Sequence, residues 1–158
     1  MAIQRHKLLD RGVQHRDAWI CVLVTEDSVR TPRYFEDLRD RRVIDPGRVR
    51  VEVVPTPPET QASAPSHVCD RAALYQQKYD LKLGLDQIWL VVDVDCWGGK
   101  QLGPTLNRAR QLGYGFAASH PCFETWLLLH LTDRVADLRT AKEAKARLGA
   151  ALDAHHAA

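Results

Sequence analysis

The chain has 158 residues, 45% of them hydrophobic, which suits one ordinary globular domain with a real core. Its formal net charge of +2 excludes a strongly basic or acidic chain, so bulk charge favours no class of partner. The cysteines at positions 21, 69, 96 and 122 have no C-x-x-C spacing, which argues against a zinc site. No signal peptide or membrane-length apolar segment is visible, and we expect a cytoplasmic protein that binds no membrane.

The first half of the chain predicts strands and helices after a basic lead-in. Residues 1–17 are polar and basic without an apolar period, so we expect a flexible N-terminal arm. The apolar run 18–24 predicts a strand buried on both faces, and Thr31 is the expected N-cap of the next helix. Alternation over 48–55 predicts a second strand, and Ser66 is the expected N-cap of a second helix.

The second half continues this alternation. Continuous apolar residues at 88–92 predict a third strand, again buried on both faces, and residues 114–118 predict a short fourth strand. Helices are expected at 100–112, 122–130 and 137–152. The helix at 122–130 is strongly apolar, and the side chains that we expect it to place in the core are Trp126, Leu127, Leu128 and His130.

Strands that alternate with helices are typical of a parallel sheet with right-handed crossovers. We therefore predict a three-layer α/β fold with a central, mainly parallel four-stranded sheet flanked by helices. No internal repeat or domain boundary is visible, so residues 18–154 are interpreted as a single domain. Residues 155–158 are interpreted as a tail without a function.

Carboxylates follow two of the predicted strands. Asp93 and Asp95 end the third strand, and residues two apart in an extended backbone point the same way. Like charges held close need a cation or a shared proton, and Mg2+ is bound by one or two carboxylates. Glu26 follows the first strand, so all three carboxylates share one pocket if the two strands are neighbours. The alternative is two strand ends that turn into solvent, where Asp is common.

The segment after the fourth strand carries the most specific pattern. Residues 119–130 read SHPCFETWLLLH, which resembles the signature SNPCFELWLLLH of the RloB family of Toprim-like proteins, found in bacterial defence loci. Residues 88–95 resemble the family's VWVVFDxD strand, and residues 24–26 with 32–36 resemble its VCEGEKTEPNYF motif. The resemblance covers residues 18–131 and implies a Toprim-like, Rossmann-like fold.

The resemblance also implies a divalent-metal-dependent nuclease for DNA or RNA. Glu26, Asp93 and Asp95 then hold Mg2+ or Mn2+, with Glu26 as a ligand or as the general base. Glu124 is either a further ligand or a carboxylate that faces the positive end of its own helix. His120 is either a proton donor or phosphate ligand, or a surface side chain.

Three cations flank the two acid loops. Arg30, Arg33 and Lys100 are candidates for holding the nucleic-acid backbone, and the alternative is ordinary surface charge. The family's neighbourhood with RloA-type ATPases implies an ATPase partner, and a homo-oligomer is a further expectation.

The chain departs from the family pattern around the first acid. Where the family has a small residue after the first acid, this chain has Asp27. Where the family has a second acid, a lysine and a later glutamate, this chain has Ser28, Val29 and Thr31. His120 stands where asparagine is usual. One alternative is therefore a non-catalytic Toprim-like subunit for assembly or nucleic-acid sensing in a defence complex. Another is a different phosphoryl enzyme, such as a phosphatase or nucleotidyl transferase.

Overall fold

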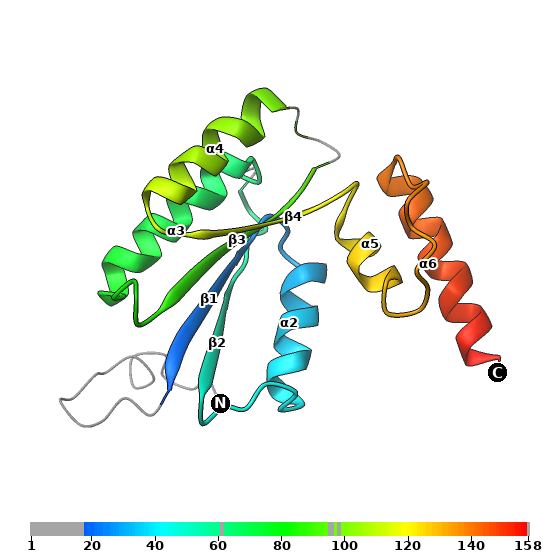
Figure 1. Cartoon of the computed structure of the whole chain (residues 1–158), viewed down its shortest axis with the longest axis horizontal. Coiled ribbons are helices and arrows are strands. Elements are labelled where there is room, and N and C mark those ends of the chain that lie inside the picture. Colours follow the sequence, from blue (N-terminus) through cyan, green and yellow to red (C-terminus); the bar gives the residue numbers. More distant parts are fainter. Residues whose placement is uncertain (1–17, 61, 95–96, 98, 158) are drawn as a thin grey trace.

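The computed structural model describes residues 18–60, 62–94, 97 and 99–157, in which strands alternate with helices as predicted (Figure 1). Each expected strand is present within one residue of its predicted ends. No helix in these ranges is long and apolar enough to cross a membrane. The elements in chain order are β1 (Trp19–Thr25), α2 (Arg30–Asp40), β2 (Val49–Val54), α3 (Pro65–Tyr79), β3 (Gln87–Asp93), α4 (Gly99–Gln111), β4 (Gly115–Ser119), α5 (Phe123–Leu128) and α6 (Ala141–His156).

The four strands form one parallel sheet in the order β2-β1-β3-β4. The first and third strands are neighbours, which is the condition under which Glu26 and Asp93 can share a pocket: β1 pairs with β3, and Thr25 lies opposite Val91. On the other side of β3, Asp93 lies opposite Ser119 at the end of β4. The segments that follow β1, β3 and β4 therefore leave the sheet at the same edge.

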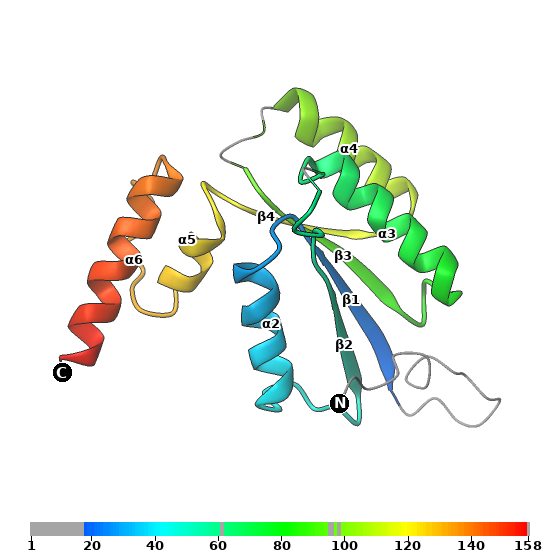
Figure 2. The same ribbon diagram turned by 180° about the vertical axis from the view of Figure 1, so that it is seen from behind.

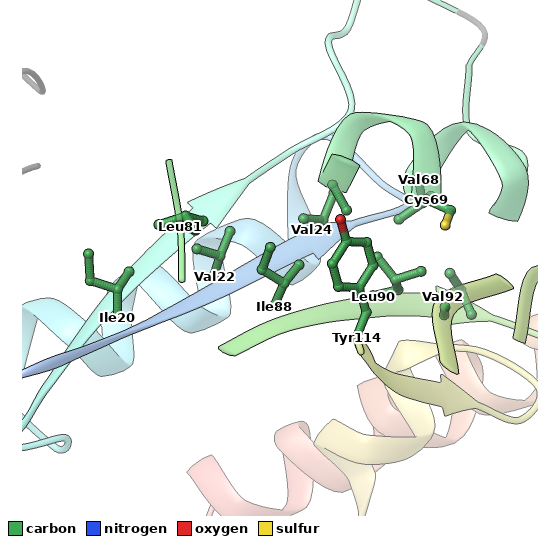
Figure 3. Close-up of a cluster of buried hydrophobic side chains, with 12 residues drawn as sticks. Ile20, Val22, Val24, Val68, Cys69, Leu81, Ile88, Leu90, Val92 and Tyr114 are labelled. Carbon is green, nitrogen blue, oxygen red and sulfur yellow. The ribbon is translucent and has the colours of Figure 1, made fainter. Parts of the chain in front are cut away.

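One face of the sheet is covered by α3 and α4, which bury the side chains that β1 and β3 present there (Figure 1). Alternate residues of β1 and β3 point to this face, and Figure 3 shows them facing α3. Full burial of one aliphatic side chain is worth about 1.5–3 kcal/mol, so this layer is a main source of stability. Its buried members are Ile20, Val22, Val24, Val68, Cys69, Ala72, Leu81, Ile88, Leu90, Val92, Ala109 and Tyr114.

The opposite face is covered less completely, by α2 (Figure 1). Val91 is buried there, but Trp19 is 39% exposed and Trp89 is 37% exposed. The prediction that β1 and β3 are buried on both faces is therefore wrong at their N-terminal halves. The physical reason is that α2 lies mainly against β2 at one side of the sheet, so among the described residues no layer covers the N-terminal halves of β1 and β3 on this face.

A second apolar cluster lies outside the sheet, between α5 and α6 (Figure 2). It is built from Cys122, Leu128, Leu138 and Ala144, each at most 2% exposed. The last helix begins later and runs further than the predicted 137–152. A capping box between Thr140 and Glu143 fixes its start.

Two predicted N-caps are wrong, because other residues start these helices. α2 begins at Arg30, ahead of Thr31, since the Asp27 carboxylate upstream already accepts hydrogen bonds from its first N–H groups. α3 begins at Pro65, one residue before Ser66. Proline suits the first helical position because the N–H that it lacks would have no partner inside the helix.

Gly115 gives a test of packing on the sheet face that α2 covers only in part. It lies opposite Trp89, and a Cβ at Gly115 would collide with the indole ring. We expect Gly115→Ala to lower the free energy of unfolding by about 1–3 kcal/mol through overpacking. In a Trp89→Ala background the same change should be neutral or stabilising. A double-mutant cycle by urea unfolding measures this coupling, and equal effects in both backgrounds would contradict the contact.

Candidate functional site

The candidate site lies where β1 and β3 end side by side. Glu26 is the first residue after β1, and its backbone N–H donates to the Val91 carbonyl at 3.0 Å. Its side chain turns back towards β3, where Oε2 accepts from the Asp93 backbone N–H at 2.8 Å. Two carboxyl-bearing residues that are 67 positions apart in the chain therefore meet at one sheet edge.

The Glu26 carboxylate is held at both of its oxygen atoms. In addition to the Asp93 contact, Oε1 accepts from the Trp97 indole N–H at 2.8 Å. Each carboxylate oxygen keeps a further lone pair that can bind a cation or a proton. Trp97 thus covers and orients the Glu26 carboxylate.

A cavity of about 120 Å³ opens at this edge. Three carboxyl-bearing residues from two strand ends contribute to its wall, so its polar atoms are mainly hard oxygen acceptors. α2 also contributes through its first turn. The residues that line the cavity are Glu26, Asp27, Thr31, Ser63, Val91 and Asp93.

The two carboxylate oxygens of Asp27 have different surroundings. Its Oδ2 accepts from the backbone N–H groups of Val29, Arg30 and Thr31 at 3.3, 2.6 and 3.1 Å, so it caps α2. Its Oδ1 is buried and has no hydrogen-bond partner among the described residues. A buried acceptor without a partner costs about 1–3 kcal/mol, which a bound cation or water would offset.

Arg71 places a positive charge behind the same strand end. This half-buried side chain of α3 donates to the carbonyls of Ala62 and Thr25 at 2.8 and 2.9 Å and to the Thr56 hydroxyl at 2.6 Å. Burial lowers the pKa of Arg71, and the charge of Glu26 opposes that shift. The guanidinium therefore ties the loop after β2 to the end of β1 and keeps a positive charge near Glu26.

Sequence reasoning missed Arg71 and gave Asp27 no role. Asp27 was interpreted only as a departure from the family pattern. An acidic residue three positions before a helix start is a recognisable capping signal, and it could have indicated that Asp27 turns towards α2. No local signal marks Arg71, because its partners lie 9 to 46 residues away.

The donor set of the cavity fits a hard divalent cation. Mg2+ is usually bound by one or two carboxylates together with water and substrate phosphates. Within the described ranges, His, Cys, Asp and Glu side chains form no group of three that could hold a metal ion. Asp95, the third predicted ligand, lies outside those ranges. Glu26, Asp27 and Asp93 line the cavity without forming such a group by themselves, so an ion there would also need ligands from water or substrate phosphate.

Glu124 lies in another contact, between three helices. It is 6% exposed, and its Oε1 lies 2.5 Å from the Arg30 guanidinium of α2 and 3.9 Å from the Lys145 ammonium of α6. Burial, and then a hydrogen bond to Glu124, raise the pKa of the Cys122 thiol to about 12. Glu124 does not line the carboxylate cavity, and it joins α2, α5 and α6.

The other predicted site residues lie near the same edge but outside the cavity wall. His120 is exposed and follows β4 directly, joined to Pro121 by a cis peptide bond. Arg33 is exposed on α2, and Lys100 is exposed in the first turn of α4. Arg30 is engaged by Glu124, although its side chain keeps 64% of its exposure.

The predicted core position of two residues on α5 and after it is wrong. Trp126 is 46% exposed, and His130 is also exposed. α5 is shorter than the predicted helix, and Leu128 carries its contact with α6, so Trp126 turns towards α2 instead. There its indole N–H donates to the Tyr34 hydroxyl at 3.2 Å.

Comparison with known proteins agrees with the motif analysis. A family model described as RloB-like protein matches residues 21–157. Neither a curated protein nor a solved structure matches the chain.

The two functions of Asp27 can be separated by substitution. We expect Asp27→Ala to lower the free energy of unfolding by about 0.5–2 kcal/mol, because α2 loses its cap. Asp27→Asn keeps an oxygen acceptor for the cap, so most of that stability should remain. Urea unfolding of both variants measures the difference. Equal losses in the two variants would show that charge, rather than capping, is what Asp27 contributes to stability.

Glu124 can be tested as a joint between helices. We expect Glu124→Gln to lower the free energy of unfolding by about 1–2 kcal/mol, because a buried carboxylate loses its charged contacts while Arg30 stays solvated. The matched variant Lys145→Gln should cost less than about 0.5 kcal/mol, since that pair is long and exposed. Thermal unfolding in EDTA measures both. An unchanged stability of Glu124→Gln would contradict the joint.

Proposed function

Because the chain belongs to the RloB-like family, we propose that it is a divalent-metal-dependent nuclease, or the nuclease subunit, of a bacterial anti-phage or abortive-infection system. The observation that carries this proposal is the contact between Glu26 and Asp93 across adjacent parallel strands, beside Asp27 in one small cavity. Acidic groups at the carboxyl ends of parallel strands lie where open α/β sheets bind their ligands.

The chemistry follows from the charge of the substrate. A phosphodiester is an anion that repels nucleophiles, and bound Mg2+ or Mn2+ would neutralise it, activate water and stabilise the leaving oxygen. In this proposal Asp93 and Asp95 hold the ion, and Asp27 supplies its free Oδ1. Glu26, whose two oxygen atoms accept from the Asp93 N–H and the Trp97 indole, would accept a proton from the attacking water.

The surrounding charges support an anionic substrate. Arg30 and Arg33 are exposed on α2 beside the cavity wall, and Lys100 is exposed at the start of α4. We assign these side chains to the nucleic-acid backbone and His120 to the leaving group or a phosphate oxygen. A partner that keeps the nuclease silent, such as an RloA-like ATPase, and a second copy of the chain are parts of the same proposal.

Cleavage is the direct test. The purified protein is incubated with labelled single-stranded DNA, duplex DNA and tRNA in Mg2+, Mn2+ or EDTA. We expect metal-dependent cutting that falls more than about a hundredfold in Asp93→Asn, because the metal contributes several kcal/mol to the transition state. The matched variant Asp133→Asn, an exposed carboxyl in the loop before α6, should cut normally. No cutting with or without the ATPase partner would favour a non-catalytic subunit.

Binding of the ion can be measured without activity. We expect Mn2+ or Mg2+ at a hundredfold excess over its Kd to stabilise the fold by about 2.7 kcal/mol, read as a rise in Tm. Asp93→Asn and Asp27→Asn should each reduce that rise, whereas Glu124→Gln and Asp133→Asn should keep it. A rise that all four variants share would place the ion elsewhere, and a loss in Glu124→Gln would make Glu124 a ligand.

A further inference from the structure

Three aromatic side chains meet at the surface between α2 and α5, which lie side by side in both views (Figures 1 and 2). Trp126 is 46% exposed, and its ring lies 5.2 Å from the His130 ring at an angle of 79°. The Tyr34 ring lies 6.0 Å from His130, tilted by only 25°. We refer to Tyr34, Trp126 and His130 as the aromatic platform.

Hydrogen bonds hold the platform in place. The Trp126 indole N–H donates to the Tyr34 hydroxyl at 3.2 Å, and that hydroxyl lies 3.0 Å from His130 Nε2. Tyr34 also packs edge-on against the Phe123 ring at 5.4 Å, which ties the platform to the first turn of α5. The partly exposed indole ring is thus held by fixed neighbours, so little conformational entropy is left to lose when a ligand stacks on it.

The platform is bordered by positive charge. Glu124 is 6% exposed, yet it holds two cations that remain at the surface, with side-chain exposures of 64% for Arg30 and 47% for Lys145. One buried carboxylate with two exposed cations leaves a net positive group next to α5. Arg33 adds a further exposed cation on α2, directly before Tyr34.

α2 connects the platform to the carboxylate cavity. Thr31, in its first turn, lines the cavity, and Tyr34 lies about one helical turn, or roughly 5 Å, further along the axis. Arg33 lies between them in sequence, and Arg30, directly before Thr31, reaches Glu124 of α5. A chain of phosphates that entered the cavity would therefore pass the cations and bring an adjoining base towards Trp126.

We propose that the aromatic platform binds an unpaired base of a single-stranded nucleic acid, with Trp126 as the stacking face and Arg30, Arg33 and Lys145 on the adjoining phosphates. The base must be unpaired because the faces of bases within a duplex are covered by their neighbours. This inference deepens the proposed nuclease function, on which it rests, by naming the substrate class as single-stranded strands, loops or ends. The combination of an aromatic face with bordering cations fits nucleic acid better than an apolar protein surface.

The test measures binding in EDTA, where no metal-dependent cutting takes place. The wild-type protein is titrated at low salt into a short labelled oligothymidylate, or into the same strand in a blunt duplex. Fluorescence anisotropy measures the affinity for each. We expect tighter binding of the single strand, and about tenfold weaker binding of it by Trp126→Ala, since stacking contributes roughly 5- to 100-fold per base. Trp126→Phe should keep most of the affinity, because a phenyl ring also stacks.

Trp19→Ala is the matched control. Trp19 is 39% exposed, similar to Trp126, but it begins β1 at the opposite end of the sheet. Its removal should leave the affinity unchanged. A second readout is intrinsic fluorescence, which the unlabelled oligonucleotide should quench in the wild type and in Trp19→Phe and quench much less in Trp126→Phe.

The outcomes separate this inference from the nuclease proposal. Equal affinity for single strand and duplex, normal binding by Trp126→Ala, or no binding by the wild type would each overturn the platform, even if the protein cuts. Normal oligonucleotide binding by Trp126→Ala together with loss of a protein partner would make the platform a protein-docking surface. Binding that depends on Trp126 in a protein that never cuts would keep the platform and overturn the nuclease.

Discussion

The contact between the Glu26 carboxylate and the Asp93 backbone N–H depends on the order of the strands, and the site depends on that contact. β1 and β3 are parallel neighbours, so their C-terminal ends lie side by side, and Glu26 continues their pairing through its side chain. Trp97 holds the other oxygen of the same carboxylate. A single acidic side chain thereby fixes the end of β3, the Trp97 indole and one wall of the cavity.

A second buried carboxylate organises the part of the chain outside the sheet. Glu124 joins α2 through Arg30 and α6 through Lys145, and it accepts a hydrogen bond from Cys122, the residue before α5. Charged groups are seldom buried unless they are paired, so this arrangement fixes the position of α5 against α2. The same arrangement leaves the two cations at the surface and places Trp126 beside Tyr34. Stability and the proposed recognition of nucleic acid thus depend on one joint.

The sequence determined the α/β class, the four parallel strands and the family, because these follow from patterns that are local. Apolar runs, glycine and proline positions, and the segment 119–130 are each legible within a few residues. Glu26 and Asp93 were also predictable as partners, since residues at the carboxyl ends of neighbouring parallel strands share an edge. Thr31 and Ser66 were wrongly predicted as N-caps. Asp27 accepts hydrogen bonds from the first N–H groups of α2, and α3 already begins at Pro65.

Only the tertiary structure decided which apolar residues are buried and which charges are paired. Trp126 and Trp89 lie in apolar segments that predict a core position, yet both are exposed, because α2 and α6 cover only part of the faces available to them. In the sequence, Arg30 and Arg71 look like any surface arginine, because the groups that they contact lie up to 94 residues away. Burial and pairing depend on contacts between segments that are distant in the sequence, whereas the strand pattern and the family motif depend only on residues that are close in the sequence.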